Sequence, residues 1–180
     1  KIVFNEGVLD TNVALKRSNN DLIIKYSESD QITVQNYFDA NGASGYRIDQ
    51  IVFNDGTIWD VNIIKEKVLE PSESSDIIQG YNTNDQLNGL AGNDKIYGNL
   101  GSDIITGGLG NDYLDGGSGN DTYIFSLGDG QDVINSHENN ANKLDKIVFN
   151  EGVLDTNVAL KRRALLHKPS IKSLFSNIIS

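Results

Sequence analysis

Aspartates recur at every ninth position in the middle of this chain, and they are the residues most suited to chemistry. Five of them follow one another at this spacing: Asp85, Asp94, Asp103, Asp112 and Asp121. Carboxylates that stack closely repel one another unless positive charge lies between them. Lys95 is the only basic side chain in residues 71–135, against ten acidic ones. Protein cations therefore cannot balance the charge, and a metal ion is implied.

The aspartates belong to a nine-residue pattern that runs through residues 80–124. Its five units read GYNTNDQLN, GLAGNDKIY, GNLGSDIIT, GGLGNDYLD and GGSGNDTYI. Glycine opens each unit, aspartate is sixth and a large side chain is eighth. Glycine and asparagine tolerate the positive φ of tight turns, and the last three residues predict a short strand whose middle side chain points inward. A fixed short period is typical of a solenoid.

Two units are expected to make one coil, with two strands and two turns. Turns along one edge then come from alternate units. A weaker preceding unit, PSESSDIIQ, contributes a further aspartate. The expected edges are Asp85, Asp103 and Asp121 on one side, and Asp76, Asp94 and Asp112 on the other. Carboxylates and turn carbonyls are hard oxygen ligands, which suit Ca²⁺.

The units resemble the GGxGxDxUx repeat of the RTX (repeats-in-toxin) family, also called haemolysin-type calcium-binding repeats. The resemblance implies an all-β fold built on a parallel β-roll, a right-handed solenoid with several Ca²⁺ ions stacked along both edges. In the family, one turn supplies its first and third carbonyls and its aspartate. The next turn on that edge supplies its second and fourth carbonyls and its aspartate.

Carried over to this sequence, in either polarity, the family pattern pairs the turn of Asp103 with that of Asp121, and the turn of Asp94 with that of Asp112. The implied metal ligands are Asp85, Gly89, Ala91, Gly92, Asp94, Gly98, Leu100, Gly101, Asp103, Gly107, Gly108, Leu109, Gly110, Asp112, Gly116, Gly117, Ser118, Gly119, Asp121 and Asp132. Two units depart from the pattern, because GYNTND lacks the later glycines and PSESSD lacks all of them.

Three other interpretations of the repeats compete with a calcium-binding roll. Segments rich in glycine, asparagine and aspartate are often flexible linkers, but a linker does not require the phased apolar residues. An EF-hand needs an Asp-x-Asp-x-Asp-Gly loop with a terminal Glu, and this spacing is absent. A phosphate-binding loop needs Gly-Lys-Ser/Thr, which follows none of these glycines.

The register returns after a two-residue insertion, in residues 127–134. Asp132 is therefore either one more ligand, on the edge of Asp112, or part of a surface turn. The end of the chain, residues 163–180, is apolar and basic. The RTX resemblance implies an uncleaved C-terminal signal for type I secretion, which this segment would fit. A frameshift and a cloning-derived tail are the alternatives.

A second repeat has a much longer period. Residues 146–162 repeat residues 1–17, KIVFNEGVLDTNVALKR, at an offset of 145. We interpret this as recent duplication of a large module within a tandem array. The expected organisation has four parts: a β-rich flanking domain in 1–70, the roll in 71–135, the start of a second flanking block in 136–162, and the tail in 163–180.

The flanking domain is expected to be β-rich with one short helix. The phrase FNDGTIWD resembles a small domain that often flanks RTX repeats. Trp59 is interpreted as a core residue and Asp60 as the N-cap of a helix through Val68. The expected strands are Ala14–Arg17, Asp21–Tyr26, Gln31–Phe38, Arg47–Asn54 and Thr57–Trp59.

The overall charge restricts the partners of this chain. The net charge of −10 combines −15 in residues 1–160 with five basic and no acidic side chains in 161–180. An acidic main body argues against nucleic acid and anionic membranes as its partners. There is no cysteine, hence no disulfide, and no apolar run is long enough for a membrane-spanning helix. The chain starts without a signal-peptide layout, which we interpret as a fragment.

No catalytic motif accompanies the aspartates. His137 and His167, the two histidines, lie in no HExxH pattern, and no G-x-S-x-G is present. The sequence therefore predicts a non-catalytic module. We expect a calcium-binding RTX module of a secreted, extracellular toxin or exoprotein that folds on Ca²⁺ after leaving through the type I secretion machinery. The alternative is an adhesin-type module that recognises a glycan or a host protein.

Overall fold

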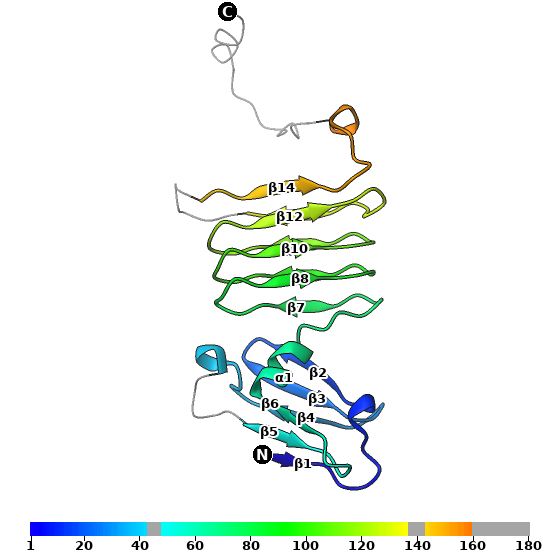
Figure 1. Ribbon diagram of the computed structural model, residues 1–180, viewed down its shortest axis with the longest axis vertical. Helices are drawn as coiled ribbons and strands as arrows, with labels where there is room; N and C mark the ends of the chain where they lie inside the picture. The colour runs from blue at the N-terminus through cyan, green and yellow to red at the C-terminus, as the bar shows by residue number, and fades with distance from the viewer. Residues whose placement is uncertain (43–47, 137–142, 160–180) are drawn as a thin grey trace, which may run out of the picture.

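The structure is a computed structural model, and it describes residues 1–42, 48–136 and 143–159 (Figure 1). A β-rich part built from the N-terminal residues lies at one end, and a solenoid of stacked strands extends away from it. The expected C-terminal secretion signal lies outside the described residues. Among those residues, no helix is both long and apolar enough to span a membrane.

The solenoid consists of two parallel four-stranded sheets, and successive units of the repeat alternate between them. The strands of one sheet, in spatial order, are β14 (Lys146–Phe149), β12 (Thr122–Phe125), β10 (Ile104–Thr106) and β8 (Gln86–Asn88). Those of the other sheet are β13 (Val133–Asn135), β11 (Tyr113–Asp115), β9 (Lys95–Tyr97) and β7 (Ile77–Gln79). The alternation makes an 18-residue coil, and the predicted parallel β-roll is confirmed.

The core of the roll is thin, because each repeat unit contributes one apolar side chain to it. Leu87 pairs in register with Ile105, and Ile105 with Tyr123, because the partners are one coil apart. The eighth residues of the units are all buried: Ile78, Leu87, Ile96, Ile105, Leu114 and Tyr123. Their neighbours on each strand point outward, as the period of two in a strand requires. The inward position predicted from the repeat is therefore confirmed.

The roll continues beyond residue 135, where the sequence predicted its end. β14 pairs in parallel with β12, so Ile147 lies beside Tyr123. The sequence missed this strand because the chain needs 24 residues, rather than 18, to return from Asp121 to Asp145. This longer excursion hides the period.

In its described residues, the flanking part contains two three-stranded sheets and one helix. One sheet is ordered β1 (Ile2–Val3), β5 (Gln50–Val52) and β6 (Ile58–Asp60). The other is ordered β2 (Ala14–Ser18), β3 (Asp21–Lys25) and β4 (Gln31–Val34). The helix is α1 (Val61–Lys67), and short 3₁₀ turns span Asp10–Asn12, Asp39–Gly42 and Asp155–Asn157.

Local sequence signals explain most of these elements. The hairpin of β2 and β3 turns at Asn19, whose φ of 52° is left-handed. The predicted helix cap is confirmed, because the Asp60 carboxylate accepts the N–H groups of Asn62 and Ile63 at 2.9 and 3.0 Å. Trp59 is buried in the core, as expected.

Two predicted strands are shorter than expected. β4 ends at Val34 instead of Phe38, because Asn36 takes a φ of 55° and donates its N–H to Asp21 Oδ1 at 2.8 Å. Tyr37 is still fully buried after this turn. The strand predicted over residues 47–54 is reduced to β5, and residues 43–47 lie outside the described part of the chain.

The flanking part and the roll meet through a few specific contacts. Tyr81, from the first turn of the roll, is buried in the flanking core and donates its hydroxyl to Lys65 O at 3.0 Å. Arg17 Nη1 donates to Gly80 O at 2.8 Å. Leu69 packs against both cores. The first coil is therefore anchored to the flanking domain.

Candidate metal-binding site

The turns of the roll carry two columns of aspartates, one along each edge. In every layer, the backbone N–H of an aspartate donates to Oδ1 of the aspartate one coil further along. In the first column, this chain of bonds joins Asp76, Asp94, Asp112 and Asp132 at 2.7–2.9 Å. In the second, it joins Asp85, Asp103, Asp121 and Asp145 at 2.8–3.0 Å. The two-edged arrangement predicted from the repeat is confirmed.

The structure adds one aspartate that the sequence analysis missed. Asp145 receives the N–H of Asp121 and so extends the second column. It precedes Ile147 by two residues, which is the spacing between aspartate and strand centre in every repeat unit. That spacing was the available signal. Asp132 lies in the first column, next to Asp112, as one of its two interpretations required.

The middle aspartates are buried with one oxygen unpaired. Asp94, Asp103, Asp112 and Asp121 are at most 2% exposed. In each of them, Oδ1 accepts the backbone bond and the buried Oδ2 has no hydrogen-bond partner, although Asp121 Oδ2 lies 3.4 Å from the ammonium of Lys143. A buried carboxylate oxygen without a partner is costly, because it has lost its hydration. These four oxygens therefore identify positions where a cation would stabilise the fold.

The space beside each unpaired oxygen depends on glycine. A Cβ built on Gly98 would lie 2.1 Å from Asp103 Oδ2 and 2.5 Å from Gly116 O, the carbonyl of the next turn on that edge. Gly89 has the same relation to Asp94 Oδ2 and Gly107 O, both at 2.3 Å. A side chain at the first position would fill this space. The glycine thus keeps open a gap lined by a carboxylate and a carbonyl.

The carbonyl directions select one of the two polarities allowed by the sequence. Here the lower turn is residues 98–103 and the upper turn is residues 116–121. The second and fourth carbonyls of the lower turn, Asn99 O and Gly101 O, face the upper turn. They lie 2.0 and 1.8 Å from a Cβ built on Gly117 and on Gly119, respectively. Ser118 O, the third carbonyl of the upper turn, faces down and accepts Gly101 N.

The lower turn therefore directs its second and fourth carbonyls into the gap, and the upper turn its first and third. Each carbonyl oxygen has two lone pairs, so a backbone bond still leaves one for a metal. Two carboxylates and up to four carbonyls make a set of hard oxygen ligands, as Ca²⁺ prefers. Among the described residues, no three His, Cys, Asp or Glu side chains gather at one point. Any ion held here thus depends on backbone ligands.

Burial also changes the acidity of the two columns. The pKa of Asp103 is raised to about 6, mainly by desolvation; the bond from the Asp85 N–H opposes this shift, and the charges of Asp121 and Asp85 add to it. Desolvation likewise raises the pKa of Asp94 and of Asp112. Without a cation, each column resists carrying its full negative charge.

A lysine occupies the cation position of the last layer. Lys143 Nζ lies 3.4 Å from Asp121 Oδ2 and 3.3 Å from Asp145 Oδ2, and it donates to Gly117 O. Its side chain is 8% exposed. These three oxygens belong to the aspartate of the lower turn, the aspartate of the upper turn and the second carbonyl of the lower turn. Burial alone would lower the pKa of Lys143, but its contacts with Asp145 and Asp121 outweigh burial and raise it.

The opposite end of the roll is also bound by protein groups. Asp76 Oδ2 accepts bonds from Ser72 N at 2.8 Å and Ser72 Oγ at 2.7 Å, and Lys16 Nζ lies 3.5 Å from Oδ1. Both carboxylate oxygens of Asp76 therefore have partners within the protein, whereas Oδ2 of Asp94 and of Asp112 has none.

Comparison with known families matches both parts of the chain. Residues 72–105, 89–123 and 97–134 match the RTX calcium-binding nonapeptide repeat, in overlapping sets of four copies. Residues 21–62 match the haemolysin-type calcium-binding protein related domain. The chain carries RTX calcium-binding repeats. Their repeat pattern is the one whose aspartates and glycines form the gaps described above.

One curated relative matches part of this chain. Iron-regulated protein FrpA of Neisseria meningitidis serogroup C is 37% identical over 83 residues, which is 46% of this chain and 7% of that protein. The match therefore concerns a small part of FrpA, whose name refers to the whole protein.

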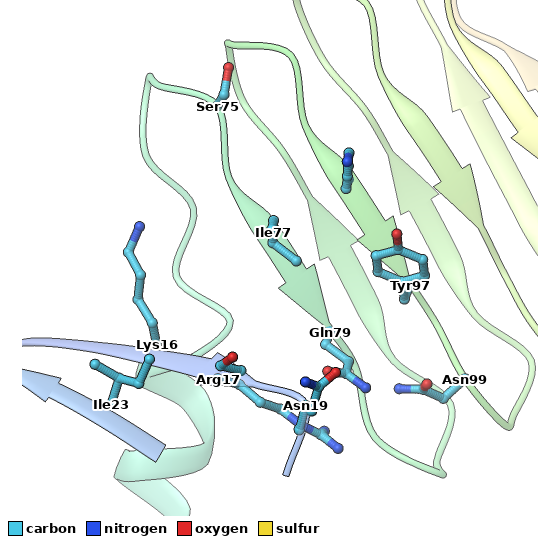
Figure 2. Close-up of a pocket in the computed structure, with 11 residues that line it drawn as sticks. Lys16, Arg17, Asn19, Ile23, Ser75, Ile77, Gln79, Tyr97 and Asn99 are labelled. Atoms are coloured by element: carbon cyan, nitrogen blue, oxygen red, sulfur yellow. The ribbon is translucent and has the colours of Figure 1, made fainter. Parts of the chain in front are cut away.

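An open cleft of about 640 Å³ lies where the flanking domain meets the RTX repeats (Figure 2). Lys16, Arg17 and Lys95 give it a basic lining, in contrast to the acidic roll. Two of its polar side chains are engaged, since Arg17 and Asn99 both donate to Gly80 O, at 2.8 and 2.7 Å. The bond of Arg17 joins the flanking domain to the roll.

Proposed function

We propose that this chain is a calcium-triggered folding module, in which Ca²⁺ between successive turns allows the two aspartate columns to be buried. The observation that supports it most is that the buried Oδ2 atoms of Asp94, Asp103 and Asp112 have no hydrogen-bond partner, while the fourth such atom, Asp121 Oδ2, meets a lysine ammonium. Residues 71–135 carry one basic and ten acidic side chains, a net charge of −9. This charge opposes compaction when no metal is bound, so that metal binding would supply folding free energy.

We assign the complete sites to the gaps between glycine-bearing turns in the middle of the roll. On the second edge, the gap with the most complete set of ligands lies between residues 98–103 and residues 116–121. On the first edge, it lies between residues 89–94 and residues 107–112. In these gaps, the implied ligands are two aspartates, the second and fourth carbonyls of the lower turn, and the first and third of the upper turn.

The gaps toward the ends of the columns are less complete. On the second edge, residues 80–85 would share a further ion with residues 98–103. On the first edge, residues 107–112 would share one with Asp132. The layer of Asp121 and Asp145 contains the Lys143 ammonium instead. Bound calcium would thus be a property of the middle layers.

The module would act outside the cell. Low cytosolic Ca²⁺ would leave the repeats unfolded for export, and millimolar Ca²⁺ outside would fold them. The RTX resemblance implies the type I secretion machinery as the partner for this step. Deletion of residues 163–180 should then abolish export while calcium binding by residues 71–135 persists. Unchanged export would leave the frameshift or cloning-derived interpretation of the tail.

Calorimetric titration with Ca²⁺, starting from chelator-treated protein, tests the proposed function. We expect several ions per chain, together with a gain of β-structure in circular dichroism. Magnesium should substitute poorly, because it requires a smaller octahedral site. A roll that is equally folded in chelator and in millimolar Ca²⁺ would contradict the proposal.

A further inference from the structure

The two copies of the duplicated segment fold alike locally. Gly7 and Gly152 have φ angles of 99° and 96°. In both copies, the valine next to this glycine donates to an asparagine carbonyl: Val8 to Asn5 at 3.4 Å and Val153 to Asn150 at 3.2 Å. A 3₁₀ turn follows in each copy. Local sequence therefore fixes the same conformation twice.

Their tertiary partners differ completely. In the first copy, β1 pairs in parallel with β5 of the flanking sheet, so that Ile2 lies beside Ile51. In the second, β14 pairs in parallel with β12 of the roll, so that Ile147 lies beside Tyr123. One sequence thus begins the flanking domain at one end of the molecule and closes the roll at the other (Figure 1).

The two pairings use opposite edges of the strand. Lys146 N donates to Asp121 O and Asn150 N to Phe125 O, both at 2.8 Å. In the first copy, Phe4 N donates to Val52 O at 2.8 Å. Phe4 corresponds to residue 149, between the two donors that face β12. The N–H groups of successive residues point to opposite edges of a strand. The residues that donate to β12 in the second copy are therefore not equivalent to those that donate to β5 in the first.

We infer that the outer edge of β14 is a docking edge for the flanking sheet of a second copy of this module. A single strand would then be the last strand of one roll and the first strand of the next flanking sheet. The second copy is the expected occupant because the same sequence already binds β5 by the matching edge.

Side-chain burial supports the same occupant. Phe4 is 7% exposed and packs its ring 5.2 Å from Tyr26 and 5.6 Å from Phe53. The equivalent Phe149 is 45% exposed, with the Phe125 ring 6.3 Å away. Docking would bury Phe149 between the two sets of aromatic rings. Modules joined in this way would form a continuous rod with a repeat of 145 residues.

Hydrogen exchange of single amides in the existing chain, with Ca²⁺ present, tests the opposite edges first. In β14, the amides of Lys146 and Asn150 should be protected and those of Ile147 and Phe149 should exchange rapidly. In β1, the pattern should be reversed, with Phe4 protected. Protection at equivalent residues in both copies would overturn the inference.

A tandem protein tests the docking itself. Because residues 146–162 repeat residues 1–17, residues 1–162 can be followed by 18–180 without altering the sequence at the joint. We expect exchange at Ile147 and Phe149 to slow by about 100-fold relative to the single chain, as their amides become paired. Unchanged exchange, with both Trp59 copies buried, would overturn the proposal.

A proline variant of the tandem protein separates docking from folding. Ile147→Pro removes a donor that faces outward, which edge strands tolerate, and leaves the donors to β12 in place. We expect rapid exchange to return at Phe149 while the calcium stoichiometry is unchanged. Val148→Pro is the matched control, because it removes an inward donor and should detach β14 from the roll. Continued protection of Phe149 in the Ile147→Pro protein would contradict docking through this edge.

Discussion

The flanking domain and the roll are both built from short strands, but they are stabilised differently. Among the described residues, the flanking core joins apolar side chains from both sheets and the helix, including Leu22, Trp59 and Ile64. The roll buries one apolar side chain on each of six strands and, next to them, four aspartates. Burial of apolar surface can stabilise the first part directly. The second combines a thin core with buried charge, so its stability should depend on a bound cation.

Removal of calcium should produce the largest difference between the two parts. In chelator, we expect the roll to lose its β-structure, because repulsion within the columns is no longer compensated. Trp59 is the only tryptophan and is buried in the flanking domain at 4% exposure. Its fluorescence should therefore remain that of a folded protein while circular dichroism reports loss of the roll.

Addition of urea to the chelated protein provides the control for this comparison. A separate unfolding transition of Trp59 should persist without calcium. Loss of the Trp59 signal together with the roll would show that the two parts fold as one unit, and the comparison would fail.

Asp112→Ala should have the next largest effect. Asp112 lies between Asp94 and Asp132, with an unpaired buried Oδ2, so its removal would affect the gaps on both sides. Asp76 is bound by Ser72 and needs no metal. We expect Asp112→Ala to raise the Ca²⁺ midpoint for folding about tenfold, or about 1.4 kcal/mol, and Asp76→Ala to raise it less than about twofold.

Calorimetric titration of the two variants side by side measures this contrast. Asp112→Asn is a matched variant, because it retains an oxygen for the Asp94 N–H and loses the charge. It should behave like Asp112→Ala if the charge matters more than the backbone bond. Equal effects of the Asp76 and Asp112 substitutions would contradict the stacked arrangement.

Lys143→Ala should convert the last layer into a calcium site. The substitution removes the ammonium that lies between Asp121 and Asp145 and leaves both carboxylates. We expect the bound stoichiometry to rise by about one ion, and the metal-free roll to become less stable. Lys146→Ala, at an exposed position on β14, is the control and should change neither. An unchanged stoichiometry in Lys143→Ala would show that the layer lacks the carbonyls an ion requires.

The smallest effect concerns pH in the absence of metal. The pKa of Asp103 is raised to about 6 in the folded roll, above its ordinary value of 3.8, mainly by desolvation. Folding therefore favours the protonated form. The associated stability is fully present below pH 3.8 and is lost as the pH rises through about 6.

We thus expect chelated protein to gain β-structure as the pH falls from 7 toward 4, with Trp59 fluorescence changing little over that range. Circular dichroism of the chelated protein measures this gain. A metal-free roll that loses structure on acidification would contradict the assigned direction of the pKa shift.

The roll was predictable because each of its features repeats. The inward residue, the alternation of edges and the column of Asp94 and Asp112 all follow from a period of nine. Asp145 was missed because a longer excursion breaks that period. The carbonyl polarity was undetermined because it depends on backbone angles that residue type does not fix. Leu90 and Asn99 take positive φ at the second position, where later units have glycine.

The flanking domain was predictable only where local chemistry dominates. Asp60 caps its helix through its own side chain, and the turn at Asn19 follows from residue preference. The early end of β4 depends instead on a bond from Asn36 to Asp21, fifteen residues away. The role of Lys143 was likewise hidden, because its two carboxylate partners are separated in sequence from one another and meet only through the stacking of coils.

The 18-residue coil has a consequence for how such a module can change in length. Insertion of one nine-residue unit would carry every later residue to the opposite edge. For an insertion between Asp76 and Asp121, Lys143 and its two aspartates would move together to the edge of Asp76, and β12 and β14 would join the sheet of β7. Insertion of two units would lengthen the roll and leave the terminal layer on its present edge. Gains and losses of repeats that keep the orientation of this terminus relative to the flanking domain should therefore occur in pairs, so that the number of units between Asp76 and Asp145 obeys a parity rule.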